Sequence, residues 1–149
     1  MNIKVEQEQN ILEFFSRHTL LQSVKCELFI EESIVKFIEA LMIGMLDSCP
    51  NLRSMHILQT GEADFSLDSS IFRKLTISRL NTLKINFDFK IIPHAAVINH
   101  TLKNLSILNP GVSNSTLLRM CDTFRKLTHL EMSNLEDEGL QCIINHLVS

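Results

Sequence analysis

The stretch HLEMSNLEDEGLQCIINHL (residues 129–147) changes its hydrophobic period part-way along. Leu130 and Met132 alternate with polar residues, as in a strand that buries one face. An acidic run at 136–138 follows, and acidic residues favour a helix start because they complement the helix dipole. Apolar residues then recur at helical spacing, namely Leu140, Ile143, Ile144 and Leu147. The stretch therefore predicts one unit made of a strand, a turn and an amphipathic helix.

The same unit recurs along the chain. A motif of the form L-x-x-L-x-L, with conservative replacements, has its apolar positions at Leu21, Val24 and Cys26; Leu52, Met55 and Ile57; Leu80, Leu83 and Ile85; Leu102, Leu105 and Ile107; and Leu127, Leu130 and Met132. Successive motifs begin roughly 22 to 31 residues apart, close to the period of about 20–29 residues of strand-and-helix repeats. We expect parallel strands to begin near residues 21, 52, 80, 102 and 127, with the motif residues in the core.

Helices are predicted between the motifs. After the first motif, an apolar stripe contains Ile34, Phe37, Ile38, Leu41 and Met45, and Pro50 ends this helix at Cys49. After the fourth motif, a cap at Ser113 or Asn114 predicts a helix with an inner stripe of Leu117, Leu118, Cys121 and Phe124.

The remaining connections predict shorter helices. One is expected near Asp68–Leu75, and Pro93 permits at most about two turns between residues 88 and 99. The segment Glu6–His18 reads as a helix with Ile11, Phe14 and Phe15 facing inward. It is either an end cap or the helical half of an earlier repeat.

Two segments resemble the cysteine-containing leucine-rich repeats of F-box proteins: CPNLRSMHI (Cys49–Ile57) and LTHLEMSNLEDEGLQCI (Leu127–Ile143). In that family a helix ends in Cys-Pro-Asn-Leu, and an acidic-Gly-Leu sequence like DEGL at 137–140 starts another helix. The resemblance runs from about residue 20 to the C-terminus. It implies one α/β domain over residues 1–149, a leucine-rich-repeat right-handed solenoid (horseshoe) with a parallel concave sheet and convex helices. Residues 1–19 are then an N-terminal helix or a partial repeat.

The chain departs from the family pattern in two ways. Where the family often has Cys or Asn after each strand, this sequence has Phe29, Thr60, Asp88, Pro110 and Leu135. A regular buried polar ladder is therefore not expected. No F-box precedes the first motif, so we do not expect this chain alone to dock onto a cullin-type ubiquitin ligase. A fragment, a truncated gene product and a stand-alone repeat protein all fit the sequence.

Composition narrows the class of protein. Hydrophobic residues make up 45% of the 149 residues, which is sufficient for a core. The 17 acidic and 14 basic residues give a net charge of −3, which argues against a nucleic-acid groove. No apolar run approaches the roughly 18 residues of a membrane span. The N-terminus MNIKVEQEQN does not read as a secretory signal, so we expect a cytoplasmic or nuclear protein.

The sequence offers little catalytic or metal-binding chemistry. The four Cys residues are far apart and read as small buried hydrophobes: Cys26, Cys49, Cys121 and Cys142. The six His residues lack the helical i, i+4 spacing of a zinc site, and no Gly-rich phosphate loop is present. We therefore expect no catalytic residue, cofactor or metal. The sequons at Asn99, Asn104 and Asn114 read as chance matches.

The outward strand positions form the candidate site. On the concave sheet these are Ser23, Lys25, Glu27, Ser54, His56, Leu58, Thr82, Lys84, Asn86, Asn104, Ser106, Leu108, His129, Glu131 and Ser133. This polar surface of mixed charge suits a polypeptide partner better than a polyanion or a membrane. The alternative is a solvated sheet face, with partners at an edge or on the convex side.

These observations favour a non-enzymatic protein–protein interaction module. The family resemblance implies a substrate-recognition portion like that of F-box ubiquitin-ligase subunits, with ligase subunits as partners if an F-box exists elsewhere. The alternative is a stand-alone scaffold or assembly factor with no link to ubiquitin. A hydrolase using Cys and His has the least support, because nothing in the sequence pairs a Cys with a base.

Overall fold

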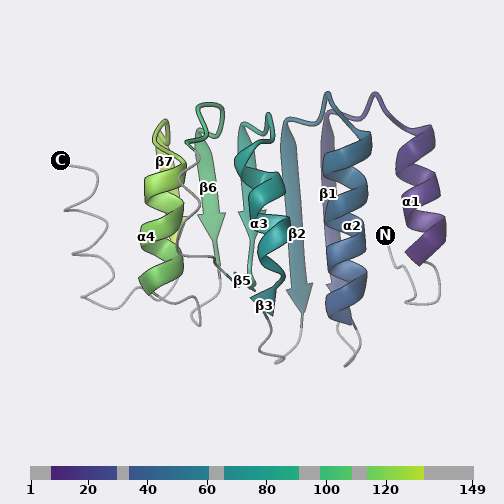
Figure 1. Ribbon diagram of the computed structural model, residues 1–149, viewed down its shortest axis with the longest axis horizontal. Coiled ribbons are helices and arrows are strands. Elements are labelled where there is room, and N and C mark those ends of the chain that lie inside the picture. Colours follow the sequence, from purple (N-terminus) through teal and green to yellow (C-terminus); the bar gives the residue numbers. More distant parts are fainter. Residues whose placement is uncertain (1–7, 30–33, 61–65, 91–97, 109–113, 133–149) are drawn as a thin grey trace.

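The computed structural model describes residues 8–29, 34–60, 66–90, 98–108 and 114–132. In chain order, its elements are α1 (Glu8–Arg17), β1 (Ser23–Phe29), α2 (Ile34–Ser48), β2 (Ser54–Thr60), β3 (Ser66–Leu67), α3 (Ser69–Thr76), β4 (Thr82–Ile85), β5 (Asp88–Phe89), β6 (Asn104–Ile107), α4 (Asn114–Thr123) and β7 (His129–Met132). The fold is α/β, as predicted. Five strands form one parallel sheet in the order β1-β2-β4-β6-β7, which is also their order along the chain (Figure 1).

Equivalent motif positions pair across this sheet. The middle position of each motif forms one row, in which Val24 pairs with Met55, then Leu83, Leu105 and Leu130. Each strand begins two residues after the first motif residue, because that residue lies in the turn before the strand. The turns repeat a backbone bond as well: the amides of residues 53, 81, 103 and 128 donate to the carbonyls of residues 22, 53, 81 and 103.

The core lies between the sheet and a layer of helices. Helices α2, α3 and α4 cover one face of the sheet, and α1 continues the layer beside α2 (Figure 1). All motif residues of the second, third and fourth motifs are buried, which confirms the expected inward phase. In β7, Leu130 and Met132 are only half-buried. Because neighbouring units supply the burial, an outer strand of the described sheet is less completely covered.

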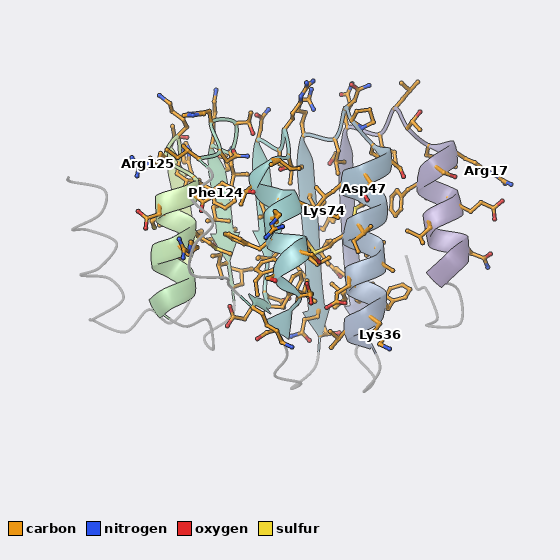
Figure 2. The ribbon with its side chains drawn as sticks, in the orientation of Figure 1. Arg17, Lys36, Asp47, Lys74, Phe124 and Arg125 are labelled. Atoms are coloured by element: carbon orange, nitrogen blue, oxygen red, sulfur yellow. The ribbon has the colours of Figure 1, made fainter. Side chains whose placement is uncertain are left out.

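Helix α2 matches the predicted helix closely. It ends at Ser48, just before Cys49-Pro50, and its Phe37, Ile38 and Leu41 are fully buried. A salt bridge joins it to α3, with Lys74 Nζ 2.8 Å from Asp47 Oδ1 (Figure 2). Both partners are substantially exposed, so this pair contributes little to stability.

Helix α1 packs against α2 through a narrow contact. A Cβ built on Gly44 of α2 would lie 3.1 Å from Leu12 Cδ2 and 3.2 Å from Phe15 Cδ2. Glycine therefore allows the two helices to approach. Phe15 is buried as predicted, but the prediction that Phe14 faces inward is wrong, since 39% of it is exposed. Within the described residues α1 packs mainly against α2, so it buries only a narrow stripe of its surface. Phe15 lies on that stripe, whereas Phe14 lies beside it and stacks on the His18 ring.

Helix α3 also matches its prediction, whereas the short strand β5 was not expected. Asp68 caps α3, because its Oδ1 accepts a hydrogen bond from the Ser70 amide. After β4, residues 88–89 pair with β3 and bury Phe89. The predicted turns beginning at Pro93 lie outside the described residues.

The predicted inner stripe of the fourth helix is confirmed at Cys121 and Phe124, the cap at Asn114 is wrong, and the side chains of Leu117 and Leu118 lie outside the described part of the chain. Helix α4 begins at Asn114, so this residue is helical rather than the cap, and Ser113 lies outside the described residues. Cys121 is buried, and Phe124 is buried immediately after the helix ends. The helix predicted after residue 136 lies outside the described residues, as do Pro110 and Leu135.

Polar side chains of different types tie neighbouring units together near the ends of the strands. The Asn86 amide pairs with both backbone groups of Gln59, at 2.8 and 2.7 Å, and so extends the contact between β2 and β4. Thr60 Oγ1 donates to the Leu28 carbonyl. Backbone groups near the ends of β1 and β2 are thus satisfied by an asparagine and a threonine side chain rather than by a regular ladder.

Candidate functional site

The predicted site residues lie on the sheet face opposite the helices. We call this the open face, formed by the outward side chains of the five strands and the residues that follow them: Ser23, Lys25, Glu27, Ser54, His56, Leu58, Thr82, Lys84, Asn86, Asn104, Ser106, Leu108, His129 and Glu131. Those of β1 and β7 are exposed, and those on or after β2, β4 and β6 are half-buried. Ser133 lies outside the described residues. The strand period therefore identified this face correctly.

Strand register sorts the open face into rows. The first row contains Ser23, Ser54, Thr82, Asn104 and His129. The second row contains Lys25, His56, Lys84, Ser106 and Glu131. Neighbouring members are about 4.8 Å apart, because that is the spacing of hydrogen-bonded strands. A ligand lying across the strands would meet one side chain of a row at each step.

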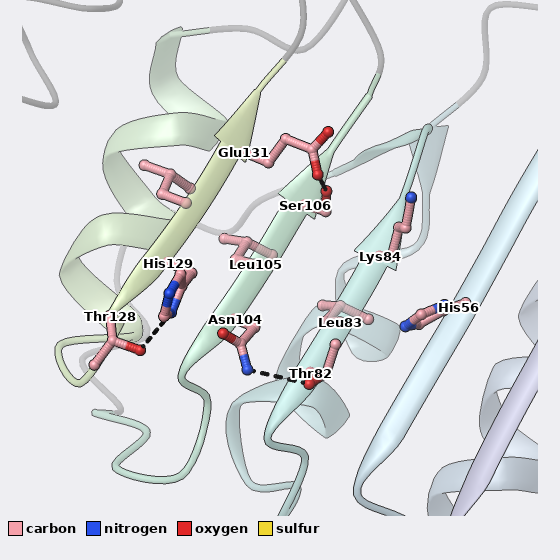
Figure 3. A pocket seen from close by; sticks show the side chains of 11 residues that line it. His56, Thr82, Leu83, Lys84, Asn104, Leu105, Ser106, Thr128, His129 and Glu131 are labelled. Carbon is pink, nitrogen blue, oxygen red and sulfur yellow. Dashed lines mark hydrogen bonds between the residues drawn. The ribbon is translucent and has the colours of Figure 1, made fainter.

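A hollow of about 540 Å³ lies over the middle and C-terminal strands of this face (Figure 3). Its lining residues are His56, Thr82, Leu83, Lys84, Asn104, Leu105, Ser106, Thr128, His129, Leu130 and Glu131. In the second row, the small side chain of Ser106 stands between the longer Lys84 and Glu131. The volume is within the range of about 300–1,000 Å³ that ligand sites occupy.

Hydrogen bonds fix several of these side chains. Ser106 Oγ donates to Glu131 Oε2 at 2.6 Å, from β6 to β7. Asn104 Nδ2 donates to Thr82 Oγ1 at 3.3 Å, from β6 to β4. These bonds cross between strands and hold part of the lining in place before any partner arrives (Figure 3).

Charge is distributed unevenly along the second row. Lys25, His56 and Lys84 stand side by side on β1, β2 and β4, whereas Glu131 carries a carboxylate on β7. Burial lowers the pKa of His56, and the neighbouring Lys84 and Lys25 lower it further. Lys25 has a carboxylate nearby, with Nζ 3.9 Å from Glu27 Oε1. The second row thus carries its lysines on β1 and β4 and its carboxylate on β7.

The described cysteines are buried in the core. Burial raises the pKa of the Cys26, Cys49 and Cys121 thiols, and the adjacent Asp122 adds to the increase at Cys121. A raised pKa keeps a thiol protonated, which is unfavourable for a nucleophile. Within the described ranges, no cluster of three or more His, Cys, Asp or Glu side chains could hold a metal ion. Cys142 lies outside those ranges.

Asn99 is an organising residue whose role was not predicted from the sequence. It is 4% exposed, and its Nδ2 donates to the carbonyls of Thr76 and Ser78 at 2.9 and 3.0 Å. Its Oδ1 accepts from the amides of Thr101 and Leu102. The sequence predicts that the glycosylation sequon at Asn99 is a chance match. In the structure, the amide nitrogen of this residue is already used in hydrogen bonds to the Thr76 and Ser78 carbonyls. The only sequence signal was a polar residue three positions before a motif leucine.

No family model matches the chain, and comparisons with the curated proteins and with the solved structures give no significant match. Every helix within the described ranges falls short of the length and apolarity that a membrane span requires. The function is therefore inferred from the open face itself.

Proposed function

We propose that the chain is a leucine-rich-repeat solenoid whose open face binds a polypeptide partner. The repeat assignment is supported by five parallel strands in chain order with equivalent apolar residues in register. It is also supported by the helices that occupy one face of the sheet (Figure 1). Stacked units of this kind present extended surfaces that proteins commonly use for binding.

The observation that carries the binding proposal is the polar, in-register open face with its hollow. Its side chains are mixed in charge and partly prearranged by hydrogen bonds between strands. Prearranged side chains lose less conformational entropy on binding. A polyanion would require more lysine and arginine than this face offers, since phosphate neutralisation dominates such binding. A polypeptide, with charges of both signs, matches it better.

Within this proposal, a substrate-recognition role like that of F-box ubiquitin-ligase subunits rests on the sequences CPNL at 49–52 and DEGL at 137–140. A stand-alone scaffold or assembly factor is the second candidate. The packing of α1 against α2 is compatible with both roles. The two roles predict the same binding face, but only the recognition role predicts that ubiquitin-ligase subunits copurify with the chain.

Affinity purification of the tagged chain from its native cells, followed by mass spectrometry, tests both the binding face and the choice between the two roles. The open-face double variant Lys84→Glu with Leu108→Arg should lose the partner. The control Lys36→Glu makes the same charge change on the exposed side of α2 and should retain it (Figure 2). Ubiquitin-ligase subunits that copurify favour the recognition role, and their absence beside a retained partner favours the scaffold. A partner lost in the Lys36 variant and retained in the double variant would refute binding at the open face.

A further inference from the structure

We infer that the open face recognises a partner segment that carries an acidic side chain and, three residues away, a basic one. This inference rests on the proposed function, because it specifies the ligand of the same face. It follows from the polarity of the second row, which carries lysines on β1 and β4, with His56 between them on β2, and a carboxylate on β7.

The acidic side chain has its counterpart at His56 and Lys84. These residues are paired in the register of β2 and β4, and His56 extends towards β4 beside Lys84 (Figure 3). Within the described chain, neither the Lys84 ammonium nor the His56 ring has an ion-pair or hydrogen-bond partner. Lys25 is one strand further and shares its charge with Glu27. Burial and, after it, the charges of Lys84 and Lys25 lower the pKa of His56, and a carboxylate bound here would offset the effect of the two lysines.

The basic side chain has its counterpart at Glu131. Its carboxylate accepts a hydrogen bond from Ser106 and has no cationic partner among the described residues. His129, two residues earlier on the same face, bonds to the Thr128 hydroxyl through its Nδ1. A guanidinium or ammonium can therefore reach Glu131 without displacing an existing ion pair. The hydrogen bond from Ser106 orients the carboxylate for that contact.

The spacing follows from sheet geometry. Lys84 and Glu131 are two strand steps apart, because Ser106 of β6 pairs with both. Two steps correspond to about 9.5 Å. A polyproline II segment repeats its direction every three residues, over about 9.3 Å. A fully extended strand would instead point residues i and i+3 to opposite sides. An acid-x-x-base segment in polyproline II conformation, lying across the strands, thus matches the spacing of the β4 and β7 backbones that carry Lys84 and Glu131.

A random dodecamer peptide library displayed on phage, selected on the purified full chain, tests this recognition. The wild type should enrich peptides with Asp or Glu three residues from Lys or Arg, in one consistent order. Lys84→Glu should enrich peptides with a basic residue in place of the acidic one. Glu131→Lys should enrich peptides with an acidic residue in place of the basic one. The matched control Lys36→Glu should enrich the wild-type pattern. Wild-type peptides should bind Lys84→Glu about two- to fivefold more weakly, as expected for a partly exposed ion pair.

The alternative outcomes separate this inference from the proposed function. If Ser106→Arg no longer binds the selected peptides, the open face is the binding site. If those peptides also show no acid-x-x-base pattern, the inference is wrong while the proposed function stands. A different spacing between the two charges would likewise overturn the inference. Selected peptides that bind Ser106→Arg and wild type equally, with all variants showing the wild-type thermal melt, would overturn both.

Discussion

Replacing Leu105 with aspartate tests the inward phase of the repeats. Leu105 is 2% exposed at the centre of β6, and its row neighbours are Leu83 and Leu130. Removing a buried leucine side chain costs about 2–5 kcal/mol of unfolding free energy. Burying a polar carboxyl group without a partner adds about 1–3 kcal/mol even when it is protonated. The total, roughly 3–8 kcal/mol, is comparable with the whole stability of a typical domain, about 5–15 kcal/mol.

The free energy of unfolding is measured by urea denaturation followed by circular dichroism at pH 7 and pH 4. We expect Leu105→Asp to be largely unfolded at pH 7. Burial raises the pKa of the new carboxyl group in the folded state. Its ionisation penalty is therefore absent below the unfolded pKa of about 3.9 and grows as the pH rises through that range. The variant should consequently be less destabilised at pH 4 than at pH 7, relative to wild type at the same pH.

Lys84→Glu is the matched control, since Lys84 lies on the open face one strand away. A surface substitution of this kind changes the unfolding free energy by only about 0.5 kcal/mol. If Lys84→Glu destabilised the protein more than Leu105→Asp, the assignment of inward and outward positions would be wrong by one residue, because a one-residue slip exchanges the two faces.

Three further predictions concern packing, a buried amide and a titrating ring. Gly44→Val should push α1 away from α2, lower the unfolding free energy by about 1–3 kcal/mol and speed limited proteolysis within α1; unchanged proteolysis would contradict the close approach of the helices. Asn99→Ala should cost about 2–4 kcal/mol in urea denaturation, because it leaves buried backbone groups without partners; a loss below about 0.5 kcal/mol, the size of a surface effect, would contradict its organising role. Lys84→Gln should raise the pKa of His56 in an NMR titration, since it removes a neighbouring positive charge. The lowered folded pKa of His56 means that stability falls as the pH drops through its unfolded pKa of about 6.5, and Lys84→Gln should reduce this loss.

The parts of the fold that follow from local period were predictable. Alternation in each motif sets which residues face the helices, so the sequence alone predicts Met55, Ile57 and Leu105 as core residues and His56 as an outward residue. The helical stripe and the Cys49-Pro50 boundary likewise gave the position of α2.

The features that depend on neighbours in space were not predictable. Phe14 has the spacing of an inward residue, but the described packing of α1 against α2 leaves it partly exposed. Residues 88–89 carry no strand signal of their own and pair only because Ser66–Leu67 lies alongside. Asn99 is recognisable as an organising residue only when the carbonyls of Thr76 and Ser78 converge on it. On the open face, the sequence identified the side chains, whereas the row order came from the register of five separate strands.

Site-specific photo-crosslinking in native cells tests the central claim, polypeptide binding at the open face, most directly. A benzoylphenylalanine residue is placed at His129, an exposed residue lining the hollow, or at Lys36, on the exposed side of α2. We predict a discrete crosslinked polypeptide from position 129 that disappears when Lys84→Glu is added, and none from position 36. A crosslink from position 36 together with none from position 129 would contradict the account.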